Sequence, residues 1–169
     1  YTPRPLRTAG PDMRTGGLGM QVDLDWIGGV AFEARTGSGH RIVLDGSPEL
    51  GGMNRGGRPM EMLLVGLAGC SAFDVVHILQ RGRHPVGSCS VSVTAERADT
   101  PPQVFTRIHL QFTLDGDGLT GAAVERAIRL SAEKYCSASV MLAQTAEITH
   151  GYRLGPASAM PDDAAGSDR

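Results

Sequence analysis

The chain has 169 residues, of which 20% are charged, and a net charge of −2 at pH 7. This length suits one domain with a core of its own, and the hydrophobic content of 41% is ordinary for a globular protein. The weak net charge produces no field that would attract nucleic acid or an anionic membrane surface, so neither partner is expected.

The first third of the chain predicts a meander of three short strands. Residues 1–17 have three prolines, three arginines and no periodicity, which predicts a flexible arm. Apolar and polar residues then alternate in three runs separated by glycine-containing turns, at residues 20–26, 30–35 and 40–44. Residues 47–57 follow as a glycine-rich loop.

A long apolar helix is predicted next, over residues 59–81. Pro59 suits the first helical position, where its missing N–H costs nothing, and Gly82 and Pro85 end the helix. The helix is apolar nearly all round, so we expect it to be buried inside the fold or inside an oligomer. Its longest uncharged run, residues 62–73, is shorter than the ~20 residues that span a bilayer. With no signal-peptide pattern at the N-terminus, a cytoplasmic location is expected.

The remaining sequence predicts strands and a second helix, and therefore an α+β fold. The expected elements are strands over residues 88–96 and 104–114, a helix over 121–135 and a closing strand over 147–154. Thr120 is expected to cap the second helix, and a short helical turn is expected after Cys136. Residues 155–169 are small and polar and predict a disordered tail.

Two of the three cysteines outline a redox site. Cys70 lies in the middle of the long apolar helix, where Gly66 and other small residues leave room for a molecule to approach the thiol. Cys136 follows the second helix, close to a new helix start, and nearby backbone N–H groups lower the pKa of a thiol placed there. A second thiol makes oxidation of the first reversible. The plain alternative is that both cysteines are inert packing residues.

Other side chains have weaker claims to a function. Asp74 and His77 share a helix face with Cys70, but two turns of helix rise by ~10 Å, so we expect one of them to close a polar network at the buried helix end. Cys89 lies in an alternating strand and is expected to pack there. With no CxxC, HExxH or Cys/His cluster, the sequence predicts no metal site and no cofactor.

The two cysteine segments, residues 58–76 and 133–137, resemble the OsmC/Ohr family of thiol-dependent hydroperoxide reductases. The resemblance covers roughly residues 20–154 and predicts an OsmC-like domain over 18–154. It implies an α+β homodimer in which antiparallel sheets wrap around two central helices, with the active sites at the subunit interface.

The resemblance also implies a reaction. The Cys70 thiolate would attack an organic hydroperoxide, and Cys136 would resolve the resulting sulfenic acid as a disulfide. An external dithiol of the lipoyl type, or a small thiol, would reduce that disulfide. The residues expected to contact a bulky apolar substrate are Met60, Met62, Gly66 and Arg58.

Two family features are missing from the sequence. Family reductases hold the reactive cysteine with a glutamate that follows the helix-starting proline, but here Met60 follows Pro59 and Glu61 comes one position late. The family arginine stands in a glycine-rich turn, and the matching turn at residues 27–30 has none. The arginines that could replace it are Arg35, Arg41, Arg55 and Arg58. These losses leave two alternatives: a non-catalytic dimer that binds an apolar or thiol-reactive small molecule, and a structural dimer whose cysteines only pack.

Overall fold

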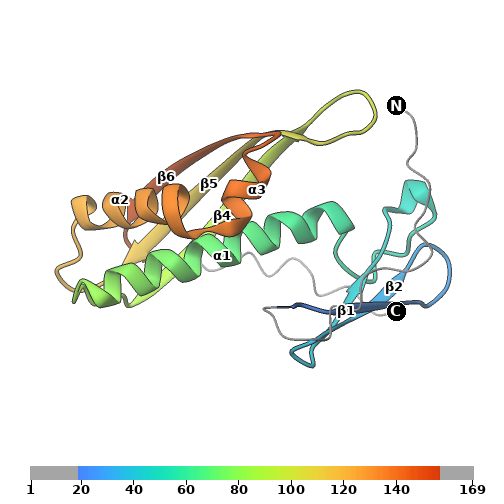
Figure 1. Cartoon of the computed structure of the whole chain (residues 1–169), viewed down its shortest axis with the longest axis horizontal. Coiled ribbons are helices and arrows are strands. Elements are labelled where there is room, and N and C mark those ends of the chain that lie inside the picture. The colour runs from blue at the N-terminus through green and yellow to red at the C-terminus, as the bar shows by residue number, and fades with distance from the viewer. Residues whose placement is uncertain (1–18, 157–169) are drawn as a thin grey trace. The chain divides into compact units, whose positions relative to one another are not determined.

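The computed structural model describes residues 19–156 and divides the chain after Pro59 into two compact units (Figure 1). Each unit contains one three-stranded sheet, which confirms the predicted α+β class. The predicted arm, residues 1–17, lies outside the described residues, as do residues 157–169 of the predicted tail.

The first unit is the predicted meander. Its strands are β1 (Val22–Trp26), β2 (Phe32–Thr36) and β3 (Arg41–Leu44), which pair antiparallel in the order β1-β2-β3. Gly28 and Gly29 form the first turn with φ angles of 101° and 60°, a left-handed conformation that glycine adopts at no steric cost. A short 3₁₀ helix, η1 (Pro48–Leu50), lies in the glycine-rich loop.

A buried carboxylate organises that loop. Asp45 is 1% exposed and accepts hydrogen bonds from the backbone N–H groups of Gly46 (2.8 Å), Met53 (3.0 Å) and Arg55 (3.1 Å). The Arg55 guanidinium lies 3.5 Å from the same carboxylate. The backbone N–H of Arg55 is the largest cause of a lowered pKa for Asp45, and it outweighs the opposing effect of burial.

We predict that Asp45→Asn destabilises the protein at pH 7 and matters less in acid. Because the folded-state pKa is below the ordinary value of 3.8, the carboxylate stabilises the fold above about pH 4. That contribution disappears as the pH falls through the lowered folded-state value. Unfolding midpoints of both proteins at pH 7, 5 and 3 should therefore converge at the acidic end. A constant difference at all three pH values would contradict this role.

The second unit contains all of α1 (Pro59–Arg81) except its first residue, and the bounds of this helix are those predicted. The other elements are β4 (Ser88–Arg97), β5 (Phe105–Asp115), α2 (Gly121–Leu130), η2 (Ser131–Tyr135), α3 (Ser137–Leu142) and β6 (Glu147–Leu154). Thr120 caps α2 as predicted, because its side chain accepts a hydrogen bond from the Ala123 N–H at 3.3 Å. The predicted second helix is interrupted: it is α-helical only to Leu130 and continues as a π-helical turn, η2.

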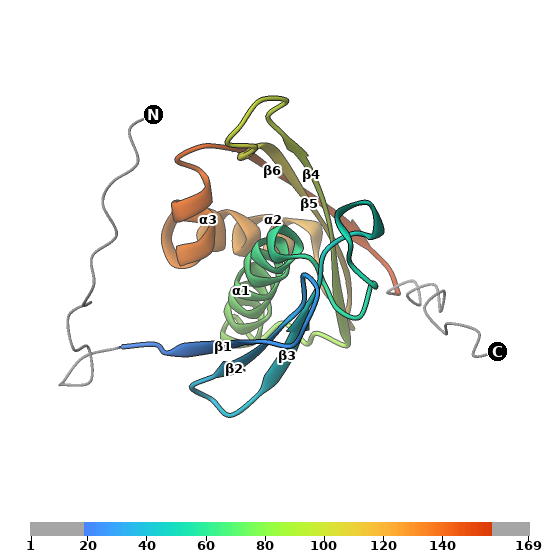
Figure 2. The same ribbon diagram turned by 90° about the vertical axis from the view of Figure 1, so that its right-hand side faces the viewer.

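The sheet of the second unit is mixed rather than wholly antiparallel. β4 pairs antiparallel with β5, whereas β6 pairs parallel with β5. The segments α2, η2 and α3 form a helical crossover between β5 and β6 that returns the chain in its original direction, as parallel pairing requires. The helices of this unit lie on one face of the sheet (Figure 2).

The core of the second unit lies between its helices and β5. Ile108, Leu110, Phe112 and Leu114 are buried on one face of β5, as expected for a covered face of a sheet, and Thr113 on the other face is buried too. α1 buries a single stripe at four-residue spacing, consisting of Leu67, Ser71, Val75 and Leu79. Much of the remaining apolar surface of α1 is exposed. The single chain therefore does not bury α1 on all sides.

Among the described residues, α1 alone is long and apolar enough to cross a membrane by length and composition. Its mean hydropathy is 1.9 over the tested 18-residue window, of which 22% is buried. The core helix of a soluble protein can have the same length and composition, and α1 buries its stripe against the core of its own unit. This property is weak evidence for a membrane span.

Candidate functional site

Cys70, Asp74 and Cys136 come together in the second unit. The two sulfur atoms and a carboxylate oxygen of Asp74 all lie within 4.8 Å of one another. Cys70 and Asp74 are half-buried on α1, and Cys136, between η2 and α3, is 0% exposed. The structure thus brings together the two thiols that the sequence analysis selected, and it adds a carboxylate.

The position of Asp74 follows from helix geometry. Residues four apart lie on one face of a helix, and helical side chains lean toward the N-terminus, so the Asp74 side chain leans toward Cys70. The expectation that Asp74 or His77 closes a polar network holds for Asp74. Its carboxylate also lies beside both thiols, which the sequence analysis did not anticipate. His77 instead stacks on Phe73, with ring centroids 5.9 Å apart.

Ser131 links the two cysteine segments. Its Oγ donates a hydrogen bond to Asp74 Oδ2 at 3.2 Å and lies 3.4 Å from Ser71 Oγ. Its backbone oxygen accepts the N–H of Cys136 at 2.8 Å, and this i to i−5 bond belongs to the π-helical turn. One buried serine therefore fixes the carboxylate next to Cys70 and the backbone of Cys136.

Sequence reasoning missed both buried serines of this network. Ser71 follows Cys70 directly, and Ser131 lies in what reads as an ordinary amphipathic helix. The available signal was weak: each serine stands at an apolar position of its helix, where a buried hydroxyl needs a partner. The sequence could not identify that partner, because the bond from Ser131 to Asp74 spans 57 residues.

The surroundings of Cys136 disfavour its thiolate. Burial is the largest cause of a raised pKa for Cys136. The hydrogen bond with Cys70 and the negative charge of a Cys70 thiolate raise the pKa of Cys136 further. The hydroxyl and the N–H of Ser139 act in the opposite direction. Cys136 occupies the N-cap position of α3, at the new helix start that the sequence predicted, but the expected lowering of its pKa is wrong because burial outweighs the effect of Ser139.

The residues expected to contact substrate lie on or just before α1. Met60 and Met62 are half-buried, and Met60 packs against the core. Gly66 is exposed one turn before Cys70, and a methyl group at this position would meet no atom within 4 Å apart from its chain neighbours and the adjacent backbone of α1. The surface beside the thiol is therefore open. Arg58 precedes α1 and belongs to the first unit.

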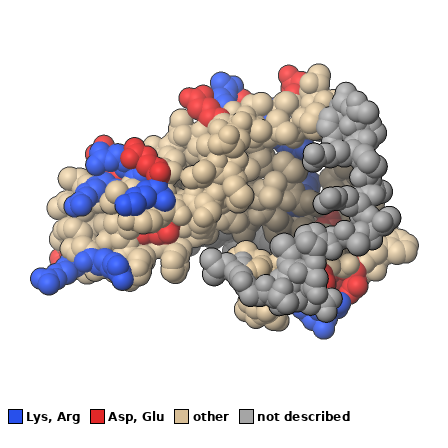
Figure 3. All heavy atoms as spheres, in the orientation of Figure 1, with Lys and Arg blue, Asp and Glu red and all other residues tan. Residues whose placement is uncertain are grey.

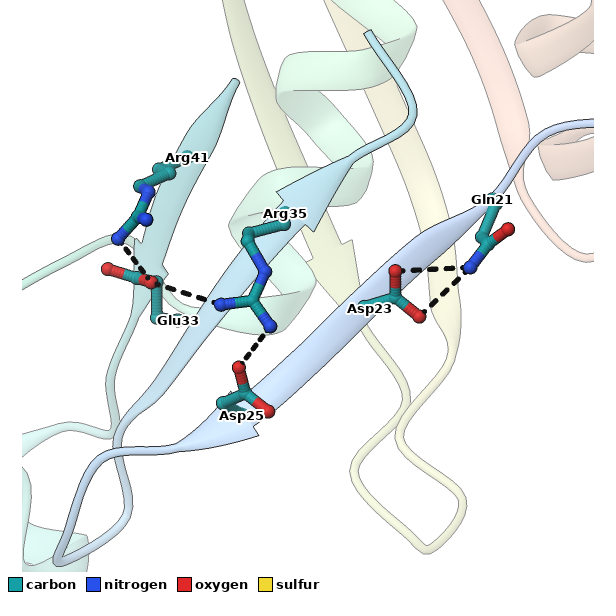
Figure 4. A network of polar contacts seen from close by, with 6 residues as sticks. All are labelled: Gln21, Asp23, Asp25, Glu33, Arg35 and Arg41. Atoms are coloured by element: carbon teal, nitrogen blue, oxygen red, sulfur yellow. Dashed lines mark hydrogen bonds and ion pairs between the residues drawn. The ribbon is translucent and has the colours of Figure 1, made fainter. Parts of the chain in front are cut away.

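The other arginines considered as partners of Cys70 have carboxylate partners in the first unit. Arg35 pairs with Asp25 and lies 3.9 Å from Glu33, and Arg41 binds Glu33 at 3.0 Å (Figure 4). Arg55 contacts the buried carboxylate described above. These pairs satisfy the three guanidinium groups locally, and the exposed pairs contribute little to stability.

Comparison with known proteins gives one consistent result. The family model described as OsmC-like protein matches residues 52–151. Protein YhfA of Escherichia coli K12 is 45% identical over 135 residues, which cover 80% of this chain and 98% of YhfA. A hypothetical protein from Aquifex aeolicus VF5 is 28% identical with a TM-score of 0.69, covering 82% of this chain and 98% of the other.

An organic hydroperoxide resistance protein OsmC from Legionella pneumophila has a similar structure. Its TM-score is 0.64, and the match covers 81% of this chain and 98% of the Legionella protein. The sequence identity is 18%, so this likeness shows the fold alone.

Proposed function

The chain belongs to the family of OsmC-like proteins, and we propose that it reduces organic hydroperoxides through Cys70 and Cys136. One observation carries the proposal: two thiols from distant segments, with a carboxylate, lie within 4.8 Å of one another. A disulfide needs its sulfur atoms about 2.05 Å apart, so a small movement of either segment would allow the bond to form.

Cys70 is the first nucleophile in this reaction. It is half-buried beside the open surface at Gly66, whereas Cys136 is fully buried. The Cys70 thiolate attacks the terminal oxygen of the hydroperoxide, the O–O bond breaks, and the leaving alkoxide takes a proton to become an alcohol. The product on the protein is a sulfenic acid.

Cys136 is the resolving thiol. It condenses with the Cys70 sulfenic acid to form a disulfide and release water, and an external dithiol returns both residues to thiols by exchange. The raised pKa of Cys136 keeps it mostly protonated at neutral pH, which suits a residue that reacts second. The reductant is proposed to be a lipoyl-type dithiol or a small thiol.

Related structures support this class of substrate. The Legionella neighbour and a neighbour from Elizabethkingia anophelis are described as organic hydroperoxide resistance proteins. A bulky apolar hydroperoxide suits the methionines and small residues of α1 around Cys70, with Met60, Met62 and Gly66 as proposed contacts. A cytoplasmic role in the response to oxidative stress, where dithiols stay reduced, belongs to the same proposal.

Stopped-flow oxidation tests the proposal on the reduced wild-type protein. We expect cumene hydroperoxide to oxidise it faster than hydrogen peroxide does, and peptide mapping should then find a disulfide between Cys70 and Cys136. Oxidation no faster than that of free cysteine would contradict peroxide reduction. That result would favour the second candidate, a non-catalytic dimer that binds an apolar or thiol-reactive molecule, for which the missing family glutamate and arginine are the motivating observation.

We also propose that the protein is a homodimer. α1 exposes Leu63, Val65 and Phe73, and Phe73 is 71% exposed; α3 exposes Val140 and Met141. On the face seen in Figure 3, charged side chains lie at the end of this unit where α1 ends and α2 begins and along the upper edge, and uncharged atoms dominate between them. Exposed apolar side chains at this density are typical of surfaces that a partner covers.

Phe73→Glu is expected to shift the protein from dimer to monomer. A charge at the centre of an apolar interface must lose its hydration when the interface forms, which costs several kcal/mol. Size-exclusion chromatography with light scattering measures the change. Val104→Glu, in the loop between β4 and β5, is the control and should leave the mass unchanged. A wild-type protein that is already monomeric at micromolar concentration would contradict the dimer.

A further inference from the structure

We propose that Cys70, Asp74 and Cys136 in their reduced form bind a thiophilic divalent cation, with Zn²⁺ as the preferred ion. Ion binding goes beyond peroxide reduction and does not depend on it, whereas the release of the ion by oxidation rests on the proposed function. The donor set is two thiols and one carboxylate, whose ligand atoms lie within 4.8 Å of one another in a site that is partly closed to water. Thiolate sulfur and carboxylate oxygen are both established zinc ligands.

The spacing suits a tetrahedral ion. Zn–S bonds of about 2.3 Å at tetrahedral angles hold two sulfur atoms about 3.8 Å apart. The observed limit of 4.8 Å therefore requires the two sulfur atoms to approach by at most about 1 Å. Three protein ligands leave the fourth position open to water or to a small thiol, as in zinc sites that exchange ligands.

The supporting residues hold the ligands in place. Cys70 and Asp74 are four residues apart on α1, a spacing that presents two ligands from one helix face. Ser131 donates to the Asp74 carboxylate at 3.2 Å and accepts the N–H of Cys136 at 2.8 Å. Such outer hydrogen bonds fix ligating carboxylates in known metal sites.

The buried hydroxyl of Ser139 is a second, independent observation that indicates a ligand at this site. The residue is 4% exposed, and its hydroxyl makes no hydrogen bond of ordinary geometry among residues 19–156. Ser139 lies in the first turn of α3, three residues after Cys136, which occupies the N-cap position of that helix. A thiolate bound to a cation would give this hydroxyl an acceptor, and a buried polar group gains from such a partner.

Metal binding and disulfide formation exclude each other, because both use the same two sulfur atoms. Zinc bound to two thiolates, one organic hydroperoxide and two protons would give free Zn²⁺, the Cys70–Cys136 disulfide, one alcohol and one water. The two thiolates lose two electrons, and these cleave the O–O bond. In this proposal the ion protects the thiols, and oxidation releases it.

Titration of the reduced, metal-free protein with Co²⁺ under anaerobic conditions tests the site. We expect a sulfur-to-cobalt charge-transfer band that saturates at one equivalent and disappears when Zn²⁺ is added. Cys70→Ser and Cys136→Ser should each weaken the band and lower the affinity by about tenfold or more. Asp74→Asn should keep the two-thiolate band but lower the affinity, and Cys89→Ser is the matched control without effect.

A second measurement uses only the wild-type protein, so that a poorly folded variant cannot decide the result. Zn²⁺ should slow the alkylation of the half-buried Cys70, but not that of the half-buried Cys89, by iodoacetamide, as read by mass spectrometry. No thiolate band with Co²⁺, or a band unchanged in Cys70→Ser, would overturn the proposal. Neither experiment uses a peroxide, so either can fail while peroxide reduction stands, and the reverse is equally possible.

Discussion

Replacing Cys70 with serine is expected to lower the rate of organic hydroperoxide reduction by roughly 100-fold or more, because a serine hydroxyl is a far weaker nucleophile than a thiolate. The substitution exchanges one sulfur for one oxygen on a half-buried helix position, so the fold should persist. Consumption of cumene hydroperoxide with excess dithiol measures the rate, and circular dichroism checks the helix content.

Cys136→Ser should separate the two steps of the reaction. Without added thiol, the first oxidation continues at Cys70 but no Cys70–Cys136 disulfide can form, so one equivalent of hydroperoxide is consumed and the sulfenic acid remains available to a sulfenic-acid trap. Cys89→Ser, on β4, is the matched control and should keep full activity. Full activity in Cys70→Ser, or repeated disulfide turnover in Cys136→Ser, would be incompatible with the assigned roles.

Much of the fold could be predicted because its signals are local. The apolar run and the proline that starts it fixed both ends of α1, and alternation located the strands to within a residue or two. The cap at Thr120 depends on a contact three residues away. The parallel pairing of β5 with β6 was not predicted, because it depends on where a crossover of about thirty residues returns the chain.

The residues of the candidate site likewise include some that local sequence signals identified and some that depend on contacts between distant segments. Cys70 and Cys136 were found because thiols are rare and their segments resemble a family. Asp74 was underestimated because the lean of helical side chains shortens its distance from Cys70. The π-helical turn at Ser131 was invisible because it ends the helical segment, and too few residues follow it to reveal a shift in the apolar pattern.

The exposed face of α1 differs from the burial that its apolar sequence predicts. A helix that is apolar nearly all round predicts burial on every side, and the second unit buries only one stripe of it. A homodimer would cover Leu63, Val65 and Phe73 and would reconcile sequence with structure. It would also enclose the open surface at Gly66, so that an apolar substrate could reach Cys70 with little water present.

Phe112→Ala is expected to destabilise the protein by about 3–5 kcal/mol. Phe112 is the largest fully buried side chain among the described residues, and it lies on β5, the middle strand of its sheet. Its ring stacks near His150, with centroids 6.5 Å apart. Removal of the ring leaves a cavity beneath the helices that carry Cys70 and Ser131, and packed elements close such a cavity only in part.

Urea denaturation gives the free energy of unfolding for this comparison, and a fall of roughly 6–20 °C in the thermal midpoint should accompany it. Phe112→Leu, which keeps most of the buried volume, should lose clearly less stability than the alanine variant. Equal losses would mean that the contact with His150, not the filled volume, determines the effect. A loss below 1 kcal/mol in both variants would show that β5 does not support the core that holds the two cysteines together, because truncation of a fully packed ring cannot be neutral there.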